Sequence, residues 1–489
     1  MKKNYLSNFT SKLPCKISEI FNKINKNEQG IIFIVDKNFV LKGSVSDGDI
    51  RRYLLKGGKL NSILKNSSSL INNSPKAKKI DSKIEDILKI LNSQKTKQKI
   101  KCLPLVNQKN QILDISRIEK IRRFPLAAPS LGDQELSNVT DAIKTGWVSS
   151  RGPYIRRFEE DFQSYLGGGY AVAVANGTCA LQIGLMSLGI KKGDEVIVPS
   201  FTFGGSINAI INAGATPVIA DVDIKNWTLD LKNIKKKMSK KTKAIMPVHI
   251  YGQPYKIDQV KKFAKEKKLM IVDDCAEAIG AVYKKKVVGL ENDCSCFSFF
   301  ANKTITTGEG GMAVFKRKKI AEKARILINQ GLSNNKRYYH DFAGTNSRIT
   351  NLQAAMGVAQ MKIIKKLLAN RKKIFSNYDK IFKTKKFLTL LNKNEWSENS
   401  YWLYTLLIND ITEKKRDLLI TKIQNLGIEC RPGFYALHKM KPFKRYADGE
   451  YLNTEYLSKT SISLPTTNLN IDSQNFIAQT FLKELENLI

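Results

Sequence analysis

The feature that most constrains the fold is a regular alternation of two kinds of stretch between residues 170 and 300. Short apolar runs, as expected of buried strands, alternate with longer stretches in which apolar residues recur at helical spacing. This order is typical of an α/β domain, in which a mostly parallel sheet carries helices on both faces. Strands are expected at 170–174, 195–198, 216–220, 244–248, 270–272 and 296–299, and helices at 179–188, 205–213 and 257–266.

Length and composition limit the class of protein. A chain of 489 residues with 42% hydrophobic residues has room for two or three domains. No apolar run approaches the ~18 residues that span a bilayer, and the N-terminus has no apolar stretch of signal-peptide length. The 7 cysteines are scattered and form neither a disulfide framework nor a zinc pattern. We therefore expect a cytoplasmic protein with no membrane contact and no metal site.

The formal net charge of +38 raises the question of a nucleic-acid partner. The lysines are spread along the whole chain, however, and no arginine-rich arm, zinc finger or aromatic-basic strand accompanies them. We therefore expect no nucleic-acid binding. The positive field could still help to recruit a small anionic substrate.

The N-terminal part, residues 13–123, contains a two-fold repeat. An apolar strand at 30–36, and a strand within 40–54 that enters a helix with Asp49 near its start, are echoed more weakly by a helical stretch at 82–91 and strands at 102–107 and 111–115. This repeat resembles a pair of cystathionine-β-synthase (CBS) domains, which often bind adenine nucleotides. The resemblance implies ribose binding by Ser46 and Asp49, because a carboxylate at a helix start can accept both ribose hydroxyls. A structural or dimerising module without a ligand remains an equal alternative.

Several chemically useful side chains follow the expected strands of the α/β domain, where function is expected in such a sheet. Ala-Asn-Gly-Thr at 175–178 precedes a helix whose free N–H groups suit a phosphate. Phe203 can stack on a flat ring. Two acids, Asp273 and Asp274, follow an apolar strand, and a buried carboxylate there needs a cation such as a protonated pyridine nitrogen. Lys303 lies in the turn after the strand that ends near Ser298, and a partly desolvated amine there has a lowered pKa and can act as a nucleophile.

Phosphate cradle, stacking ring, acid and amine together describe a pyridoxal 5′-phosphate site. From about residue 125 to the end, the chain resembles the DegT-type nucleotide-sugar aminotransferases of the aspartate-aminotransferase fold (fold type I). The matching stretches are Gly-Trp-Val-Ser-Ser-Arg-Gly-Pro at 146–153, Asn-Gly-Thr at 176–178, Pro-Ser-Phe-Thr-Phe at 199–203, Val-His-Ile-Tyr-Gly at 248–252, Asp-Cys-Ala-Glu-Ala at 274–278, residues 298–311, Gly-Thr-Asn-Ser-Arg at 344–348 and Gln-Ala-Ala at 353–355.

The resemblance implies a domain plan. It predicts an α+β CBS-like pair at 13–123, a large cofactor-binding domain with a mostly parallel sheet at 124–375, and a smaller C-terminal α+β domain at 376–489. It also implies a homodimer, in which Asn346 reaches the phosphate of the cofactor bound to the neighbouring subunit.

The resemblance also implies roles for the site residues. Lys303 would form the internal aldimine and carry the proton, and Asp274 would pair with the pyridine nitrogen. Phe203 would stack on the ring. The phosphate ligands would be Gly177, Thr178 and Ser298. Glu277 stands where relatives often carry Gln or His near the ring hydroxyl, and its role stays open because a carboxylate would repel a phenolate unless it is protonated or turned away.

Residues 427–438 most resemble enzymes that aminate the 4-keto group of a nucleotide-linked 6-deoxyhexose, such as perosamine synthases. The candidates for substrate contacts are His340, Arg348, Arg431 and His438. Guanidinium groups suit a donor carboxylate or a diphosphate, although both arginines could instead form structural ion pairs.

We therefore expect transamination of a keto-sugar nucleotide with an amino acid, expected to be glutamate, in amino-sugar and surface-polysaccharide biosynthesis. Two alternatives stay open: a catalytically inactive, nucleotide-sensing regulatory protein on this fold, and an aminotransferase that acts on a 3-keto sugar. In addition, the CBS-like pair could regulate the enzyme allosterically.

Overall fold

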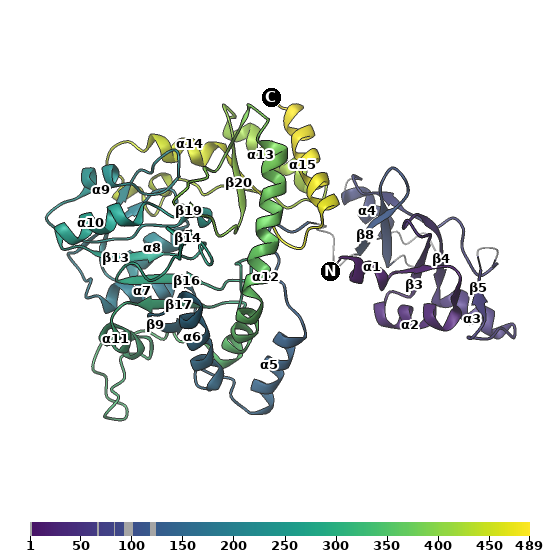
Figure 1. Ribbon diagram of the computed structural model, residues 1–489, viewed down its shortest axis with the longest axis horizontal. Coiled ribbons are helices and arrows are strands. Elements are labelled where there is room, and N and C mark those ends of the chain that lie inside the picture. The colour runs from purple at the N-terminus through teal and green to yellow at the C-terminus, as the bar shows by residue number, and fades with distance from the viewer. Residues whose placement is uncertain (1, 66–67, 83, 92–100, 118–123) are drawn as a thin grey trace. The chain divides into compact units, whose positions relative to one another are not determined.

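The computed structural model describes residues 2–65, 68–82, 84–91, 101–117 and 124–489. Their elements are shown in Figure 1, and they form two compact units. The first unit comprises Met1–Pro125 with Leu419–Glu429, and the second comprises Leu126–Leu418 with Cys430–Ile489. Residues 118–123, at the end of the expected N-terminal domain, lie outside the described residues.

A seven-stranded mixed sheet forms the centre of the second unit, with strand order β11-β10-β12-β13-β16-β17-β9. Its strands are β9 (Tyr170–Val174), β10 (Glu195–Pro199), β11 (Thr216–Ala220), β12 (Thr242–Ile245), β13 (Met270–Asp274), β16 (Cys294–Ser298) and β17 (Gly311–Phe315). Six strands run in the same direction, and β17, between β16 and β9, runs antiparallel to both neighbours. The six strands expected between residues 170 and 300 are confirmed.

The fourth expected strand was placed too far along the chain. It was predicted at 244–248, whereas β12 ends at Ile245. Pro247 explains the difference, because proline has no N–H to donate to a neighbouring strand and is disfavoured inside a sheet. Beyond it, Val248 forms only an isolated bridge with Asp274.

Helices cover both faces of this sheet and create two apolar cores. The strand β16 shows the division, because alternate side chains point to opposite faces. Cys294 and Cys296 join the core beneath α7 (Gly177–Ser187), whereas Phe297 belongs to the opposite core. The other helices of this part are α5 (Asp133–Lys144), α6 (Pro153–Leu166), α8 (Gly204–Asn212), α9 (Leu231–Lys237), α10 (Ile257–Lys267) and α11 (Lys318–Ile328).

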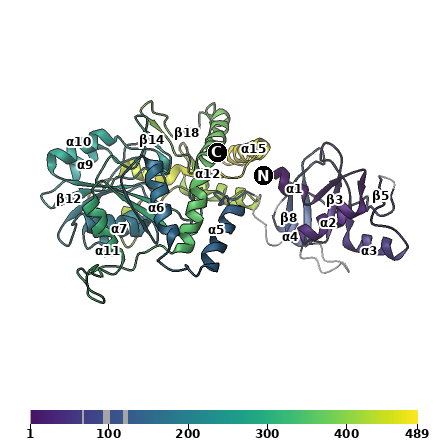
Figure 2. The same ribbon diagram turned by 60° about the horizontal axis from the view of Figure 1, so that its bottom comes forward.

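A long helix, α12 (Asn351–Phe382), connects the large sheet to the C-terminal part of the chain. Thr350 and Gln353 close its first turn with a capping box. Figures 1 and 2 both show α12 lying against α5 and α6. The C-terminal part has an antiparallel sheet of β18 (Leu388–Leu390), β20 (Tyr404–Ile408), β22 (Ser461–Leu464) and β21 (Arg431–Pro432), with helices α13 (Glu413–Asn425), α14 (Leu452–Thr460) and α15 (Ile471–Glu486).

The first unit contains an internal repeat. It holds two three-stranded sheets, ordered β1-β3-β4 and β6-β7-β8, and in each the first pair is parallel and the second antiparallel. The bounds are β1 (Thr10–Lys12), α2 (Ile17–Asn27), β3 (Ile31–Val35), β4 (Leu41–Ser46) and α3 (Asp47–Leu55) in one half, and β6 (Lys78–Lys79), α4 (Ile84–Leu91), β7 (Cys102–Val106) and β8 (Ile112–Arg117) in the other.

The turns of the two halves have the same hydrogen bonds. Asp36 Oδ1 accepts the N–H groups of Asn38 and Val40, and Asn107 Oδ1 accepts those of Lys109 and Gln111. The predicted two-fold repeat is therefore present in the backbone. The two turns also pair with each other through an isolated bridge between Val40 and Gln111.

Among the described residues, no helix has the length and apolar character needed to cross a membrane. The same residues contain no cluster of three or more side chains of the metal-binding types.

Candidate active site

The ends of three strands bring the expected site residues to one edge of the large sheet. Asp274 is the last residue of β13 and Ser298 is the last residue of β16, which runs parallel to β13. The strand β9 runs in the same direction and ends at Val174, just before the loop that enters α7. Parallel strands therefore deliver the acid, the serine and the α7 loop together.

The start of α7 has the shape of an anion cradle. Asn176 caps the helix by accepting the N–H of Cys179 at 2.9 Å, and the helix begins at Gly177. A Cβ atom on Gly177 would lie 2.9 Å from Ser298 Cβ and 3.3 Å from Ser298 Oγ. Glycine therefore keeps a gap open between the helix start and Ser298, where backbone N–H groups can receive a phosphate.

Phe203 lies at the start of α8 with 65% of its surface exposed. Its ring lies beside that of Phe434, with ring centroids 6.1 Å apart. A Cβ atom on Gly205 would lie 2.9 Å from Thr178 Oγ1 and 3.3 Å from the Phe203 ring, so Phe203 borders the anion cradle. An exposed aromatic ring beside such a cradle fits a flat phosphorylated ligand.

Asp274 is a buried acid that is held by a hydroxyl and a backbone N–H group. Its carboxylate accepts the Ser206 hydroxyl at 2.7 Å and the N–H of Ala276 at 3.1 Å. Burial raises the pKa of Asp274, while Ser206, Ala276 and the charge of Lys303 lower it. Within the part of the chain that the structure describes, no lysine or arginine forms an ion pair with this carboxylate. A protonated pyridine nitrogen would supply the missing positive charge.

Lys303 lies in the turn after β16 and is partly buried. Its N–H donates to Phe300 O at 2.8 Å, and its Nζ lies 3.7 Å from the centroid of the Trp402 ring. Burial lowers the pKa of the Lys303 amine, Arg371 lowers it further, and Glu277 and Asp274 oppose the effect. Desolvation thus favours the neutral form of the amine.

Glu277 is buried and turned toward the backbone. Its Oε2 accepts the N–H of Tyr251 at 2.6 Å, and Tyr251 adopts a left-handed backbone conformation with φ of 48°. Burial raises the pKa of Glu277 to about 7, with Lys303 and the Tyr251 N–H acting in the opposite direction. Glu277 therefore has a raised pKa, and its side chain is turned toward the backbone. These are the two conditions under which a carboxylate would not repel the phenolate of the cofactor ring.

Asn346 and Arg348 hold each other near the end of β9. Arg348 donates from Nε and Nη2 to Asn346 Oδ1 at 3.1 and 2.9 Å, and from Nη1 to Asn329 at 2.8 Å. Arg348 also forms an isolated bridge with Val174. His340 is exposed, and its Nδ1 lies 2.8 Å from Gln330 O.

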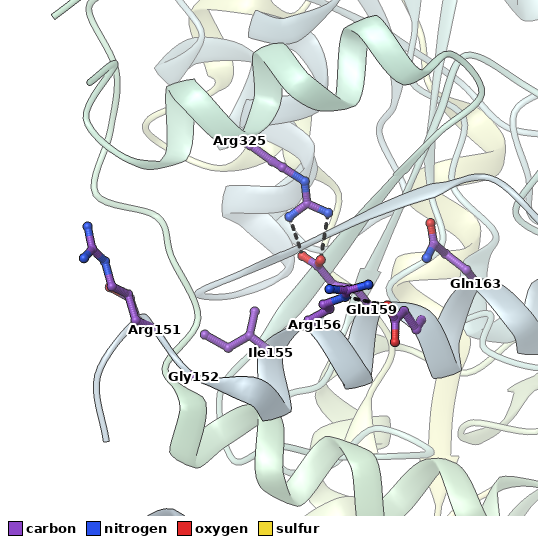
Figure 3. A pocket seen from close by; sticks show the side chains of 9 residues that line it. Arg151, Gly152, Ile155, Arg156, Glu159, Gln163 and Arg325 are labelled. Atoms are coloured by element: carbon purple, nitrogen blue, oxygen red, sulfur yellow. Dashed lines mark hydrogen bonds and ion pairs between the residues drawn. The ribbon is translucent and has the colours of Figure 1, made fainter. Parts of the chain in front are cut away.

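A neighbouring pocket at the start of α6 has a volume of about 470 Å³ (Figure 3). Its buried charge is already paired, because Arg325 forms two hydrogen bonds with Glu159 at 3.0 and 2.7 Å. Arg151 and Arg156 lie at its rim and are exposed. None of the expected site residues lines this pocket.

His438 is buried in the C-terminal part, and both of its ring nitrogens have partners. Nδ1 lies 2.7 Å from Ser200 Oγ and Nε2 lies 3.2 Å from Glu455 Oε1. Its ring also stacks on Tyr451, with centroids 4.1 Å apart. In this arrangement His438 links the C-terminal part to the loop that carries Phe203. Arg431, the remaining candidate, is exposed and lies in β21.

Sequence reasoning missed an aromatic wall that runs from Phe203 to Lys303. Phe434 lies between Phe203 and Tyr251 and stacks on Tyr251 at 5.2 Å, and Tyr251 stacks in turn on Trp402 at 6.1 Å. Tyr251 lies within the matching stretch at 248–252, which was the one signal that could have identified it. Phe434 lies within the resembling stretch at 427–438, whereas nothing local in the sequence marks Trp402.

Comparisons with known proteins agree with this geometry. Residues 129–481 match the model of the DegT/DnrJ/EryC1/StrS aminotransferase family. The GDP-perosamine synthase of Vibrio cholerae is 42% identical over 325 residues, which cover 66% of this chain and 88% of that protein. The GDP-perosamine synthase of Escherichia coli O157:H7 is 40% identical over 320 residues, covering 65% of this chain and 87% of that protein.

A solved structure has the same fold. The putative sugar aminotransferase Spr1654 of Streptococcus pneumoniae, in its PMP form, superposes with a TM-score of 0.71 at 27% identity, covering 74% of this chain and 98% of that chain. The chain therefore belongs to the DegT/DnrJ/EryC1/StrS aminotransferase family, and it is an aminotransferase that uses pyridoxal 5′-phosphate. The family match begins at residue 129 and does not cover the N-terminal repeat.

Proposed function

We propose that this member of the DegT/DnrJ/EryC1/StrS family transfers an amino group from glutamate to the 4-keto group of a nucleotide-linked 4-keto-6-deoxyhexose. The observation that carries the proposal is the 40–42% identity to three GDP-perosamine synthases across 87–88% of their lengths. It makes a guanosine diphosphate sugar the first substrate to test. The product would serve amino-sugar and surface-polysaccharide biosynthesis.

The proposed division of labour follows the geometry of the sheet edge. When bound, pyridoxal phosphate supplies a protonated ring that takes up electrons from the substrate. The helix start at Gly177 and Thr178, together with Ser298, would hold its phosphate, and Phe203 would stack on its ring. Asp274 would keep the pyridine nitrogen protonated, because a buried carboxylate stabilises a neighbouring cation.

Lys303 would bind the cofactor covalently and carry a proton on Nζ between the two reacting carbons. Burial lowers its pKa, which favours the neutral amine that can accept a proton. Glu277, with a pKa of about 7, would be neutral often enough to lie near the cofactor's ring hydroxyl without repelling it.

Substrate carboxylate and diphosphate groups would be bound by arginine. Arg348 lies beside the end of β9, and two asparagines orient its guanidinium for planar, bidentate recognition. Arg431 is exposed in β21. His340 is the remaining exposed candidate, whereas His438 would act by positioning the loop that carries Phe203.

The working unit would be a homodimer with shared active sites. Several exposed apolar side chains lie on and next to α5 and support this proposal, because exposed apolar surface is a feature of interaction sites. They are Leu131, Leu136, Ile143, Trp147 and Val148, which are 43–68% exposed. Asn346, also exposed, would contact the phosphate of the neighbouring subunit's cofactor.

For the N-terminal unit we propose a CBS-like pair that binds an adenine nucleotide and regulates the enzyme. The internal repeat supports the first part. Asp49 accepts the N–H and hydroxyl of Ser46 at 2.8 and 2.6 Å and pairs with Arg52 at 2.5 Å. A ribose would have to displace the Ser46 contacts, so a ligand-free structural module is the alternative.

The deciding experiment is a substrate screen. Purified protein with pyridoxal phosphate and glutamate would be offered matched 3-keto and 4-keto sugar nucleotides, with guanosine and thymidine diphosphate carriers, and the products weighed by mass spectrometry. We expect amination of the guanosine-linked 4-keto sugar. Preferential amination of a 3-keto sugar would establish the alternative regiochemistry. Absence of turnover with every sugar would favour the inactive regulatory protein, which the intact set of Lys303, Asp274 and Ser298 argues against.

A further inference from the structure

A buried guanidinium lies behind the reactive lysine. Arg371, on α12, is 4% exposed, and its Nη1 donates to Trp402 O at 2.5 Å while Nη2 donates to Lys303 O at 3.3 Å. In the described part of the chain, no carboxylate pairs with it. Burial lowers the pKa of Arg371 to about 10. A buried charge that has only carbonyl partners costs free energy, so its presence at this position suggests a role for the two carbonyls that it binds.

The two acceptors are the backbone carbonyls of Lys303 and of Trp402, and the Lys303 amine lies over the Trp402 ring. Trp402 is 4% exposed, its Nε1 donates to Asn302 O at 2.9 Å, and its carbonyl also accepts the Thr466 hydroxyl at 2.9 Å. The indole is thus held at both its ring and its backbone. The Lys303 Nζ lies 3.7 Å from its centroid, well within the ~6 Å range of a cation–π contact.

The charges around the Lys303 amine pull in opposite directions. Burial and the Arg371 guanidinium disfavour the ammonium form, and the carboxylates of Glu277 and Asp274 favour it. The face of an indole also favours a cation, and tryptophan is the strongest of the aromatic side chains in this respect. Trp402 therefore stabilises the protonated amine without an ion pair to Asp274 or Glu277, so both carboxylates stay available to the cofactor.

We propose that Trp402 is a positioning residue that holds the amine of Lys303 whenever the amine is not bonded to the cofactor, and that Arg371 fixes Trp402 and the lysine backbone in this arrangement. The inference rests on the cofactor chemistry of the family and does not depend on which sugar is the substrate.

The consequence follows from the bonds made on cofactor binding. Pyridoxal phosphate has an aldehyde: the neutral Lys303 amine attacks its carbon, a C=N bond forms, one water leaves, and the proton of the former ammonium passes to solvent. Pyridoxamine phosphate has an amine in place of the aldehyde, so Lys303 stays free when it binds. Trp402 therefore stabilises the cofactor-free and pyridoxamine-bound proteins but not the protein with Lys303 bonded to pyridoxal phosphate.

This gives an unusual expectation for Trp402→Leu. Loss of the ring destabilises the cofactor-free protein relative to the pyridoxal-bound protein, so pyridoxal phosphate should bind about 2- to 30-fold more tightly, the range set by cation–π energies. Pyridoxamine phosphate should bind with unchanged affinity. Trp402→Phe keeps a ring and should lie between the wild type and Trp402→Leu. Trp396→Leu, which removes a partly buried indole that packs against Tyr283, is the matched control and should change neither affinity.

The test measures the affinities of purified cofactor-free protein for pyridoxal phosphate and pyridoxamine phosphate by calorimetry. The pH dependence of Lys303 acetylation, followed by mass spectrometry, gives the pKa of the amine in the same preparations. We expect a lower pKa in Trp402→Leu. Equal weakening of both cofactors, or an unchanged pKa, would show that Trp402 only packs the site and would overturn the proposal. If Trp402→Leu does not fold, the same comparison on Trp402→Phe decides. No sugar enters these measurements, so failure of the proposed substrate would leave their outcome intact.

Discussion

Replacing Gly177 by alanine tests whether the gap at the start of α7 holds the cofactor phosphate. The added Cβ would lie 2.9 Å from Ser298 Cβ, closer than ordinary carbon contacts, and it would fill the space toward Ser298 Oγ. Overpacking of this kind typically costs about 1–3 kcal/mol of stability. If the phosphate also loses a hydrogen bond to its charged oxygens, about 1.5–3 kcal/mol of binding free energy is lost. We therefore expect about 10- to 100-fold weaker binding of pyridoxal phosphate.

Gly184→Ala is the matched control on the same helix. Its Cβ would lie 3.0 Å from Cys294 Sγ and 3.4 Å from Cys296 Sγ, a similar crowding about two turns further along α7. Both variants should unfold at lower urea concentration, but only Gly177→Ala should lose cofactor affinity. Calorimetric titration with pyridoxal phosphate and with inorganic phosphate gives the affinities. Equal cofactor affinity in the two variants would refute a phosphate site at Gly177.

Four further predictions follow from the site and from the N-terminal repeat. Lys303→Ala should lower turnover at least ~10²-fold and abolish the visible absorbance of lysine-bound cofactor; an unchanged spectrum would contradict its role. Burial lowers the pKa of His249 to about 3, so below pH 6.5 the unfolded chain binds a proton that the folded chain does not bind. The free energy of unfolding should therefore fall by about 1.4 kcal/mol for each unit by which the pH is lowered, and urea unfolding of His249→Gln should lack this slope. Glu277, with a pKa raised from 4.5 to about 7, holds a proton that the unfolded chain releases, so the cofactor-free protein should lose stability as pH rises across that interval, and Glu277→Gln should not. Calorimetry should detect binding of an adenine nucleotide to the wild type and at least tenfold weaker binding to Asp49→Ala, whereas absence of binding to the wild type would establish the structural alternative for the N-terminal unit.

The large sheet was predictable because its evidence is local. Each strand of the large sheet is four or five residues long, contains a short apolar run and is followed by a loop, and buried parallel strands have this pattern whatever they pack against. Errors were confined to the ends of elements. The expected strand at 244–248 stopped early at Pro247, and β13 continued two residues beyond the expected Val272 to Asp274. This extension places the acid on the strand itself and fixes its direction more firmly than a loop would.

The walls of the site were not predictable, because they come from residues far away in the sequence. Trp402 and Lys303 are separated by almost one hundred residues, and their contact depends on how the C-terminal sheet packs. His438 shows the same limit. A histidine in a matching segment indicated a substrate contact, whereas its two ring nitrogens bind Ser200 and Glu455. A motif identifies the residue type that a family retains, but only packing shows which atoms remain free.

The C-terminal part of the chain supplies packed aromatic rings beside the site, whereas the edge of the large sheet supplies its reactive and polar side chains. Phe203 is the exposed end of a series of rings that continues through Phe434 and Tyr251 to Trp402, and the inner rings are stacked within 16° of parallel. Closely packed rings of this kind cannot rotate without disturbing their neighbours. The Lys303 amine therefore rests on one end of this stack, and Phe203 borders the other end at a tilt of 53° to Phe434. A ring lost from its centre should disturb both ends together, whereas a change in the sheet-edge loops should disturb only one.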